Sequence, residues 1–90
     1  MLEVILDPRA REDLRALEKS AQRQVLKAVK NKLFTRPELF GVKLRGRLQD
    51  FWKLRVGDYR VGFIPGKKRV IIVAIGDRKD IYKKLERRIG

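Results

Sequence analysis

The side chains in this sequence that could carry out chemistry are mainly basic residues and tyrosines. The sequence contains no cysteine and no histidine. It therefore lacks thiolate ligands, disulfides and the side chain most often used for acid–base catalysis and metal binding. We expect no metal site and no cofactor. Any proton transfer or charge stabilisation must use Lys, Arg, Tyr or carboxylate side chains.

Positive charge dominates the sequence and is concentrated in its second half. The chain has 24 basic and 11 acidic residues, which gives a net charge of +13. Residues 1–40 contain nine basic and six acidic side chains (+3), whereas residues 41–90 contain fifteen and five (+10). A high charged content is also typical of proteins from hot environments, but ion-pair networks need both signs. The excess of cations therefore favours a nucleic-acid partner.

A cluster of three cations is predicted on one face of a β-hairpin. If the hairpin turns at Gly57-Asp58, Arg55 faces Arg60 and Lys53 faces Gly62. Side chains alternate between the two faces of a strand, so the three basic residues share one face. Like charges opposite each other destabilise a strand pair. The pattern indicates either an anion site, with room left by the glycine, or a solvated face on which the side chains spread apart.

Two further residues are expected to reach the same cluster. A strand over residues 69–75 that runs antiparallel to the hairpin returns its C-terminal end to the neighbourhood of Arg60. Arg78 and Tyr82 follow that end directly. Two alternatives remain open from the residues alone: an ion pair of Arg78 with a neighbouring aspartate, and half-burial of Tyr82 in a helix.

The elements of the first half follow from periodicity and capping residues. Residues 2–6 alternate as a short strand, and Asp7 before a proline predicts the start of a helix that reaches about Lys19. Ser20 can cap a second helix, which ends at Arg36-Pro37. Apolar residues at helical spacing mark the inner faces of this pair: Leu14, Leu17, Val25, Leu26, Val29 and Leu33.

The second half changes to strand-like periodicity and closes with a helix. Strands are predicted at residues 51–56, 59–64 and 69–75, with a weaker one at 42–44. After these, Ile81, Leu85 and Ile89 recur at i, i+4 and i+8, which predicts a short helix. The sequence therefore predicts an α+β fold, with an N-terminal strand, an αα-hairpin, an antiparallel β-meander packed on the helices and a short C-terminal helix.

Length and hydropathy predict a single domain in the cytoplasm. Ninety residues suit one domain, residues 1–90. The longest apolar run, residues 70–75, is far shorter than the ~20 residues of a membrane span. The first residues lack the basic region of a signal peptide. We therefore expect no membrane association.

Three segments resemble the RelE/ParE toxin superfamily. They are KLRG at residues 43–46, WKLRVGDYR at 52–60 and GDRKDIY at 76–82, and the resemblance extends over essentially the whole chain. It implies a toxin of a type II toxin–antitoxin system. RelE-type members are ribonucleases that enter the ribosomal A site and cleave mRNA without a metal. In that reaction the 2′-hydroxyl attacks the adjacent phosphate and leaves a 2′,3′-cyclic phosphate and a 5′-hydroxyl.

The resemblance also implies roles for individual residues. Lys53, Arg60, Arg78 and Tyr82 match the RelE catalytic pattern, with Arg55 as a helper. RelE members often carry two lysines before the arginine of the first strand, whereas this chain has one, so the base is either Lys53 or Tyr82. We assign Lys53 as the base, Arg60 as a transition-state clamp, Arg78 as clamp or proton donor, and Tyr82 to orient the nucleotide. Further RNA-binding residues are predicted to be Lys43, Arg45, Arg55, Lys79, Lys83, Lys84 and Arg87.

The implied partners are mRNA on the ribosome, ribosomal RNA and a RelB-like antitoxin. The antitoxin would be an acidic chain with an amphipathic helix that forms a hetero-oligomer with the toxin. Three alternatives remain. A ParE-like inhibitor of DNA gyrase shares the fold but generally lacks the catalytic set. A basic RNA-binding module, or a toxin homologue without activity, would share the charge without the chemistry.

Overall fold

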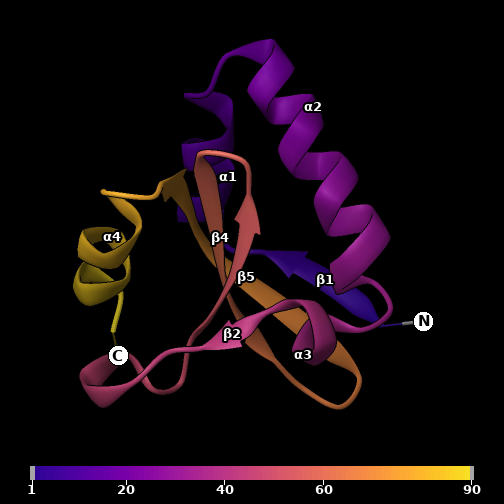
Figure 1. The fold of residues 1–90 in the computed structure, drawn as a ribbon, viewed down its shortest axis with the longest axis vertical. Coiled ribbons are helices and arrows are strands. Elements are labelled where there is room, and N and C mark those ends of the chain that lie inside the picture. Colours follow the sequence, from indigo (N-terminus) through magenta and orange to yellow (C-terminus); the bar gives the residue numbers. More distant parts are fainter. Residues whose placement is uncertain (1, 90) are drawn as a thin grey trace.

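The computed structural model describes residues 2–89 and is built around one β-sheet (Figure 1). The sheet has five strands in the order β1-β5-β4-β3-β2. Their bounds are Glu3–Leu6 (β1), Val42–Lys43 (β2), Trp52–Val56 (β3), Tyr59–Pro65 (β4) and Arg69–Asp77 (β5). Strands β2 to β5 form the predicted antiparallel meander, whereas β1 pairs in parallel with β5. The predicted α+β fold class is confirmed.

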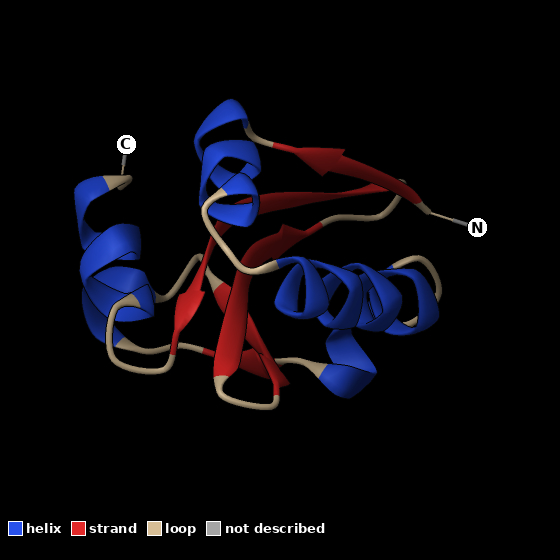
Figure 2. Ribbon diagram, turned by 90° about the horizontal axis from the view of Figure 1, so that it is seen from above, coloured by secondary structure: helices blue, strands red, loops and turns tan. Residues whose placement is uncertain are grey.

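Helices lie on both faces of this sheet (Figure 2). Their bounds are Pro8–Arg15 (α1), Lys19–Ala28 (α2), Pro37–Phe40 (α3) and Ile81–Arg87 (α4). A π-helical turn, Val29–Leu33, extends α2, and a 3-10 turn, Gly46–Leu48, precedes β3. Helices α1 and α2 pack on one face and α4 packs on the other. No helix within residues 2–89 is long and apolar enough to cross a membrane.

The helix boundaries differ from the sequence predictions in three places. Asp7 caps α1 as predicted, and its Oδ1 accepts a backbone N–H of the first turn at 2.8 Å. Helix α1 nevertheless ends at Arg15, short of the predicted end near Lys19. Helix α2 begins at Lys19 with Glu18 at its N-cap position, so the predicted cap Ser20 lies inside the helix. Helix α3 was not predicted. It begins at Pro37, because proline at the first helical position needs no hydrogen-bond acceptor for its nitrogen.

The larger core lies between the sheet and helices α1 and α2. Val25, Val29 and Leu33 are buried as predicted. Leu26, predicted for the same stripe, is 50% exposed, because it lies about 100° around the helix from its buried neighbour Val25. The sheet contributes Leu54, Val56, Val61, Phe63, Val70, Ile72 and Ile75, with Trp52 and Tyr59 at the margin.

A β-bulge at Val73 allows β5 to contribute to both cores. Ile72 pairs with Phe63 and Ala74 pairs with Gly62, which leaves Val73 as an extra residue. As a result, Ile72 packs in the larger core, while Val73 and Ala74 both pack in a smaller core beneath α4. The smaller core is completed by Leu44, Leu48, Phe51, Ile81 and Leu85.

Candidate active site

The predicted register of the β3–β4 hairpin is confirmed residue by residue. Arg55 is the partner of Arg60, and Lys53 is the partner of Gly62. Gly57, at the first position of the turn, has a φ of 59°. A type II′ turn needs this left-handed conformation there, and glycine adopts it without strain. The turn therefore places all three cations on the sheet face that also carries α4.

Gly62 does not leave room for an anion, which corrects the sequence interpretation. A Cβ atom at Gly62 would lie 2.8 Å from Cδ2 of Leu85, far inside van der Waals contact. Leu85 is fully buried and occupies the space above the glycine. The missing side chain therefore allows α4 to lie directly on β4 at the border of the cationic face.

Helix α4 brings Tyr82 into contact with Lys53. The Nζ atom of Lys53 donates a hydrogen bond of 2.7 Å to the Tyr82 hydroxyl. Tyr82 is 39% exposed, so solvent or a ligand can reach the pair. An amine and a phenol in direct contact can pass a proton between them and hold a substrate oxygen. Together with three arginines they form what we call the cationic site: Lys53, Arg55, Arg60, Arg78 and Tyr82.

Two arginines of the cationic site lie near the hairpin turn. Arg60 Nη1 donates hydrogen bonds of 2.9 Å to the carbonyl oxygens of Gly57 and Tyr59. The backbone N–H of Arg78 donates to the carbonyl oxygen of Asp58 at 3.0 Å. The loop that precedes α4 is therefore attached to the turn, and this attachment sets Arg78 beside the same end of the hairpin as Arg60.

No carboxylate within residues 2–89 forms an ion pair with the four cations of this site. Asp77 was one alternative partner for Arg78, but its Oδ1 accepts the backbone N–H groups of Lys79 and Asp80 at 2.8 Å each. These two hydrogen bonds lower the pKa of the Asp77 carboxyl. Asp77 thus shapes the start of α4, and its charge is directed to the backbone.

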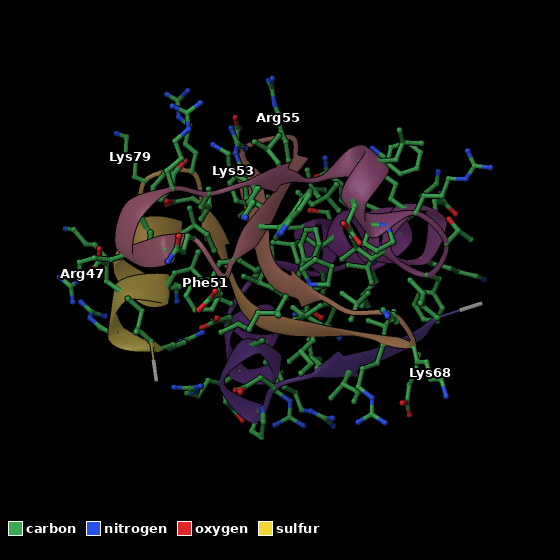
Figure 3. The ribbon with its side chains drawn as sticks, turned by 90° about the horizontal axis from the view of Figure 1, so that it is seen from below. Arg47, Phe51, Lys53, Arg55, Lys68 and Lys79 are labelled. Carbon is green, nitrogen blue, oxygen red and sulfur yellow. The ribbon has the colours of Figure 1, made fainter. Side chains whose placement is uncertain are left out.

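Most of the further RNA-binding residues lie exposed on the surface. Figure 3 shows Lys79, Lys53 and Arg55 projecting along the same side of the molecule, whereas Lys68 lies at a distant end. The exposed members of the predicted set are Lys43, Arg45, Arg55, Lys79, Lys83 and Arg87. Lys84 differs from them, because its Nζ donates to Asp13 Oδ1 at 2.9 Å.

A second charged cluster, centred on Asp13, was not predicted from the sequence. Asp13 is 8% exposed and accepts hydrogen bonds from Lys84 Nζ, from both Nη atoms of Arg88 and from the backbone N–H of Ile75. Arg88 Nη1 also donates to the carbonyl oxygen of Val73 at 3.0 Å. We call Asp13, Lys84 and Arg88 the aspartate cluster. The cluster supplies hydrogen-bond partners for backbone groups of β5 beyond the end of β1.

Burial and hydrogen bonding act in opposite directions on Asp13. Burial by itself raises the pKa of a carboxyl group because it disfavours the charged form. The hydrogen bonds from Arg88, the Ile75 N–H and Lys84 outweigh this effect, and the pKa of Asp13 is lowered. The available sequence signal was an acidic residue within the apolar stripe of α1, next to the partly buried Leu14.

The match to a family model decides which proteins this chain is related to. The model of the ParE toxin of type II toxin–antitoxin systems, parDE, matches residues 4–82. The chain belongs to this toxin family. The predicted RelE/ParE superfamily is thereby confirmed. A search of curated protein sequences finds no significant match.

Solved structures similar to this toxin include several RelE proteins. The toxin–antitoxin complex RelBE2 from Mycobacterium tuberculosis is 25% identical with a TM-score of 0.81, and the match covers 86% of this chain and 98% of the other. A double-arginine mutant of free RelE from Escherichia coli is 26% identical with a TM-score of 0.74, covering 99% and 98%. The RelE–RelB complex from Pyrococcus horikoshii is 27% identical with a TM-score of 0.68, covering 86% and 94%.

Proposed function

We propose that this toxin is an endoribonuclease that cleaves mRNA in the ribosomal A site without a metal ion, and that it acts in the cytoplasm. The observation that carries the proposal is the 2.7 Å hydrogen bond between Lys53 and Tyr82, set among arginines that have no carboxylate partner within residues 2–89. A polyanion is the ligand that such a group of cations binds most favourably.

The reaction requires a base, stabilisation of a phosphorane and protonation of the leaving oxygen. Lys53, in its neutral form, removes the proton of the 2′-hydroxyl while the 2′-oxygen forms a bond to phosphorus. The bond from phosphorus to the 5′-oxygen breaks, and this oxygen takes up a proton. Arg78 serves as the proton donor or as a second clamp. Tyr82 holds Lys53 through its hydroxyl and orients the nucleotide.

Arg60 has acceptors in the free toxin that a phosphate can replace. Its guanidinium donates to the neutral carbonyl oxygens of Gly57 and Tyr59. Hydrogen bonds to an ionised phosphate are roughly twice as strong as hydrogen bonds between neutral groups. A bound phosphate would therefore draw the Arg60 guanidinium from the turn towards the substrate, in the forked geometry that lysine cannot reproduce.

The ribosome would supply the remaining substrate positioning. Amine and guanidinium groups are weak acid–base catalysts at neutral pH, so the rate depends on how well the mRNA is held. The exposed cations of the predicted RNA-binding set would contact the ribosomal RNA backbone. We expect cleavage to fall steeply as salt rises from about 50 to 200 mM, since each phosphate contact releases counterions; a flat response would remove this role.

An acidic antitoxin is the proposed protein partner, in a hetero-oligomer. Several similar solved structures are RelB–RelE complexes. On this toxin, a mainly apolar groove at the C-terminal end of α2 and along the π-helical turn is lined by Leu26, Val29, Lys30, Asn31 and Phe34. An amphipathic helix with acidic flanks would bury its apolar stripe there and place its carboxylates near the basic residues of α2.

Inhibition of DNA gyrase is the second candidate function, because the matching family model is that of ParE toxins. The two functions make opposite predictions for the cationic site. Cleavage of RNA depends on the Lys53–Tyr82 pair, whereas gyrase inhibition requires no acid–base group at this position.

The deciding experiment is cleavage of ribosome-bound mRNA by the purified toxin, with Arg60→Ala and Arg78→Ala as test variants. Lys68→Ala is the matched control, because it removes one exposed cation distant from the site. We expect cleavage in the A site by the unmutated toxin and by the control, and loss of cleavage in both test variants. Absence of cleavage by the unmutated toxin, together with inhibition of gyrase supercoiling in a parallel assay, would replace this proposal with the second candidate.

A further inference from the structure

Helix α4, which presents Tyr82 to Lys53, is too short to hold its position alone. It has seven residues, and isolated helices shorter than about 12 residues are unstable in water. Its start is fixed by the Asp77 carboxylate, which accepts two backbone N–H groups of the preceding loop. Its middle is fixed by Leu85 against Gly62.

Electrostatic repulsion opposes the docking of α4 on the sheet. The helix and the residue that follows it carry four cations and only one carboxylate, and they pack beside a sheet face that is itself cationic. Like charges at close range destabilise the arrangement that brings them together. The cations of α4 and its C-cap are Lys83, Lys84, Arg87 and Arg88, and the carboxylate is Glu86.

The aspartate cluster provides the compensating attraction. Lys84 and Arg88 are four residues apart and therefore lie on one side of the helix end. Both reach Asp13, with contacts of 2.9 Å from Lys84 Nζ to Oδ1 and 2.7 Å from Arg88 Nη1 to Oδ2. Asp13 is itself held by the N–H of Ile75 in the sheet. The carboxylate thus attaches the end of α4 to α1 and β5 at once.

We propose that Asp13 is a positioning residue for the cationic site: it holds α4 in the orientation that sets the Tyr82 hydroxyl against Lys53 Nζ. The inference rests on the proposed function for its effect on RNA cleavage, but not for its effect on the position of Tyr82. Tyr82 has one hydrogen-bond partner for its hydroxyl within residues 2–89, Lys53. A displacement of α4 would therefore separate the base from the group that orients it.

The test variant is Asp13→Asn, which keeps the size of the side chain and removes its charge. The matched control is Glu12→Gln, which removes the same charge from the adjacent position of α1. Glu12 is a suitable control because its side chain is 70% exposed and its ion pair is with Arg15 on the same helix. Arg88→Gln is a milder second variant, in which Asp13 keeps Lys84 and the Ile75 N–H.

The first readout is structural and requires no activity. In NMR spectra we expect Asp13→Asn and Arg88→Gln to weaken the contacts between the Tyr82 ring and the Lys53 side chain, and to speed amide exchange in residues 81–87. Amide exchange in β3 and β4 should stay as in the unmutated toxin. In Glu12→Gln, both the Tyr82–Lys53 contacts and the exchange of residues 81–87 should also stay unchanged. Retention of the Tyr82–Lys53 contacts and of α4 protection in both variants would overturn the inference. If Asp13→Asn does not fold, Arg88→Gln alone decides.

The second readout is kinetic and separates positioning from general stability. We expect Asp13→Asn to lower kcat for cleavage of ribosome-bound mRNA by about 10- to 100-fold, because misplacement of catalytic groups by about 1 Å has effects of this size. KM should change little, since the exposed RNA-binding cations remain. In a Tyr82→Phe background, Asp13→Asn should change kcat less than twofold, because both substitutions break the same contact, the hydrogen bond between Lys53 and the Tyr82 hydroxyl. Full, multiplicative effects in that background would contradict the proposal. A toxin that cleaves no RNA would defeat the proposed function and leave the NMR test intact.

Discussion

The aspartate cluster and the cationic site both depend on side chains from α4, yet they differ in charge balance and exposure. In the aspartate cluster, a carboxylate that is 8% exposed accepts hydrogen bonds from Lys84, Arg88 and the Ile75 N–H. In the cationic site, no carboxylate within residues 2–89 pairs with the lysine or the arginines. The aspartate cluster contains its own carboxylate, whereas the cations of the cationic site have no carboxylate partner within residues 2–89.

The difference indicates how a strongly basic chain separates structural from functional charge. A buried charge without a partner costs several kcal/mol, so buried cations require a carboxylate. Cations on an open sheet face keep part of their solvation, which weakens their mutual repulsion. Substitutions in the aspartate cluster should therefore lower stability and, through the position of α4, also the cleavage rate. Substitutions in the cationic site should lower the cleavage rate without a loss of stability.

The largest effect is expected for Arg60→Ala, measured as the rate of mRNA cleavage on the ribosome. Removal of one donor that stabilises a transition-state charge lowers kcat by about 100- to 1,000-fold. The free energy of unfolding in urea should change little, because the loss of the Arg60 hydrogen bonds to the turn is offset by relief of its repulsion with Arg55. A large fall in the free energy of unfolding beside the fall in kcat would contradict the expected difference between the two clusters.

The next largest effect is expected for Asp13→Ala, measured by urea denaturation. This change leaves Arg88, 14% exposed in its side chain, without its carboxylate, and also removes the acceptor of the Ile75 N–H. We expect the free energy of unfolding to fall by about 3 kcal/mol. Glu12→Ala is the control and should cost less than about 1 kcal/mol, since its ion pair is exposed.

A smaller effect is expected for Gly62→Ala, which tests the contact between β4 and α4. The added methyl group would meet Leu85 Cδ2 at 2.8 Å, and overpacking of this kind costs about 1–3 kcal/mol. Since Leu85 belongs to α4, we also expect slower RNA cleavage. A Gly62→Ala variant with unchanged stability in urea would show that α4 can shift at no cost.

The smallest expected effect is the contribution of Asp13 to the pH dependence of stability. The folded toxin holds the pKa of Asp13 below the ordinary value of 3.8, so the folded state favours the charged carboxylate. This stabilisation is present above the ordinary pKa and is lost as the pH falls through the lowered value in the folded state. Urea denaturation between neutral and acid pH should therefore show a shallower loss of stability for Asp13→Asn than for the unmutated toxin, with Glu12→Gln close to the latter.

Local patterns were sufficient to predict the sheet face of the site, and long-range contacts were not. Strand alternation and the turn at Gly57 fix the positions of Lys53, Arg55 and Arg60, because each depends only on near neighbours in sequence. The aspartate cluster joins residues 71 and 75 positions apart, and periodicity carries no information about such pairs. The closing helix was predicted from Ile81, Leu85 and Ile89.

Two further differences from the predictions concern single residues. Ile89 is 41% exposed, because α4 ends at Arg87 and the chain leaves the helical path before the third position of the stripe. Gly62 was interpreted as open space because the partner that fills it, Leu85, lies far along the chain. The contact of Lys53 with Tyr82 was anticipated only as proximity, since the register of β5 was needed to place α4.

The closed edge of β5 also bears on the solubility of this chain. The strand contains a continuous β-branched and apolar run, residues 70–75, which is the composition that forms intermolecular β-sheets most readily. One edge of β5 is paired with β4, and the other is covered by β1 and then by Asp13 and Arg88, which take up the Ile75 N–H and the Val73 carbonyl. The two edge strands of the sheet are short: β1 has four residues and β2 has two. Strand-to-strand polymerisation of the folded toxin is thereby suppressed.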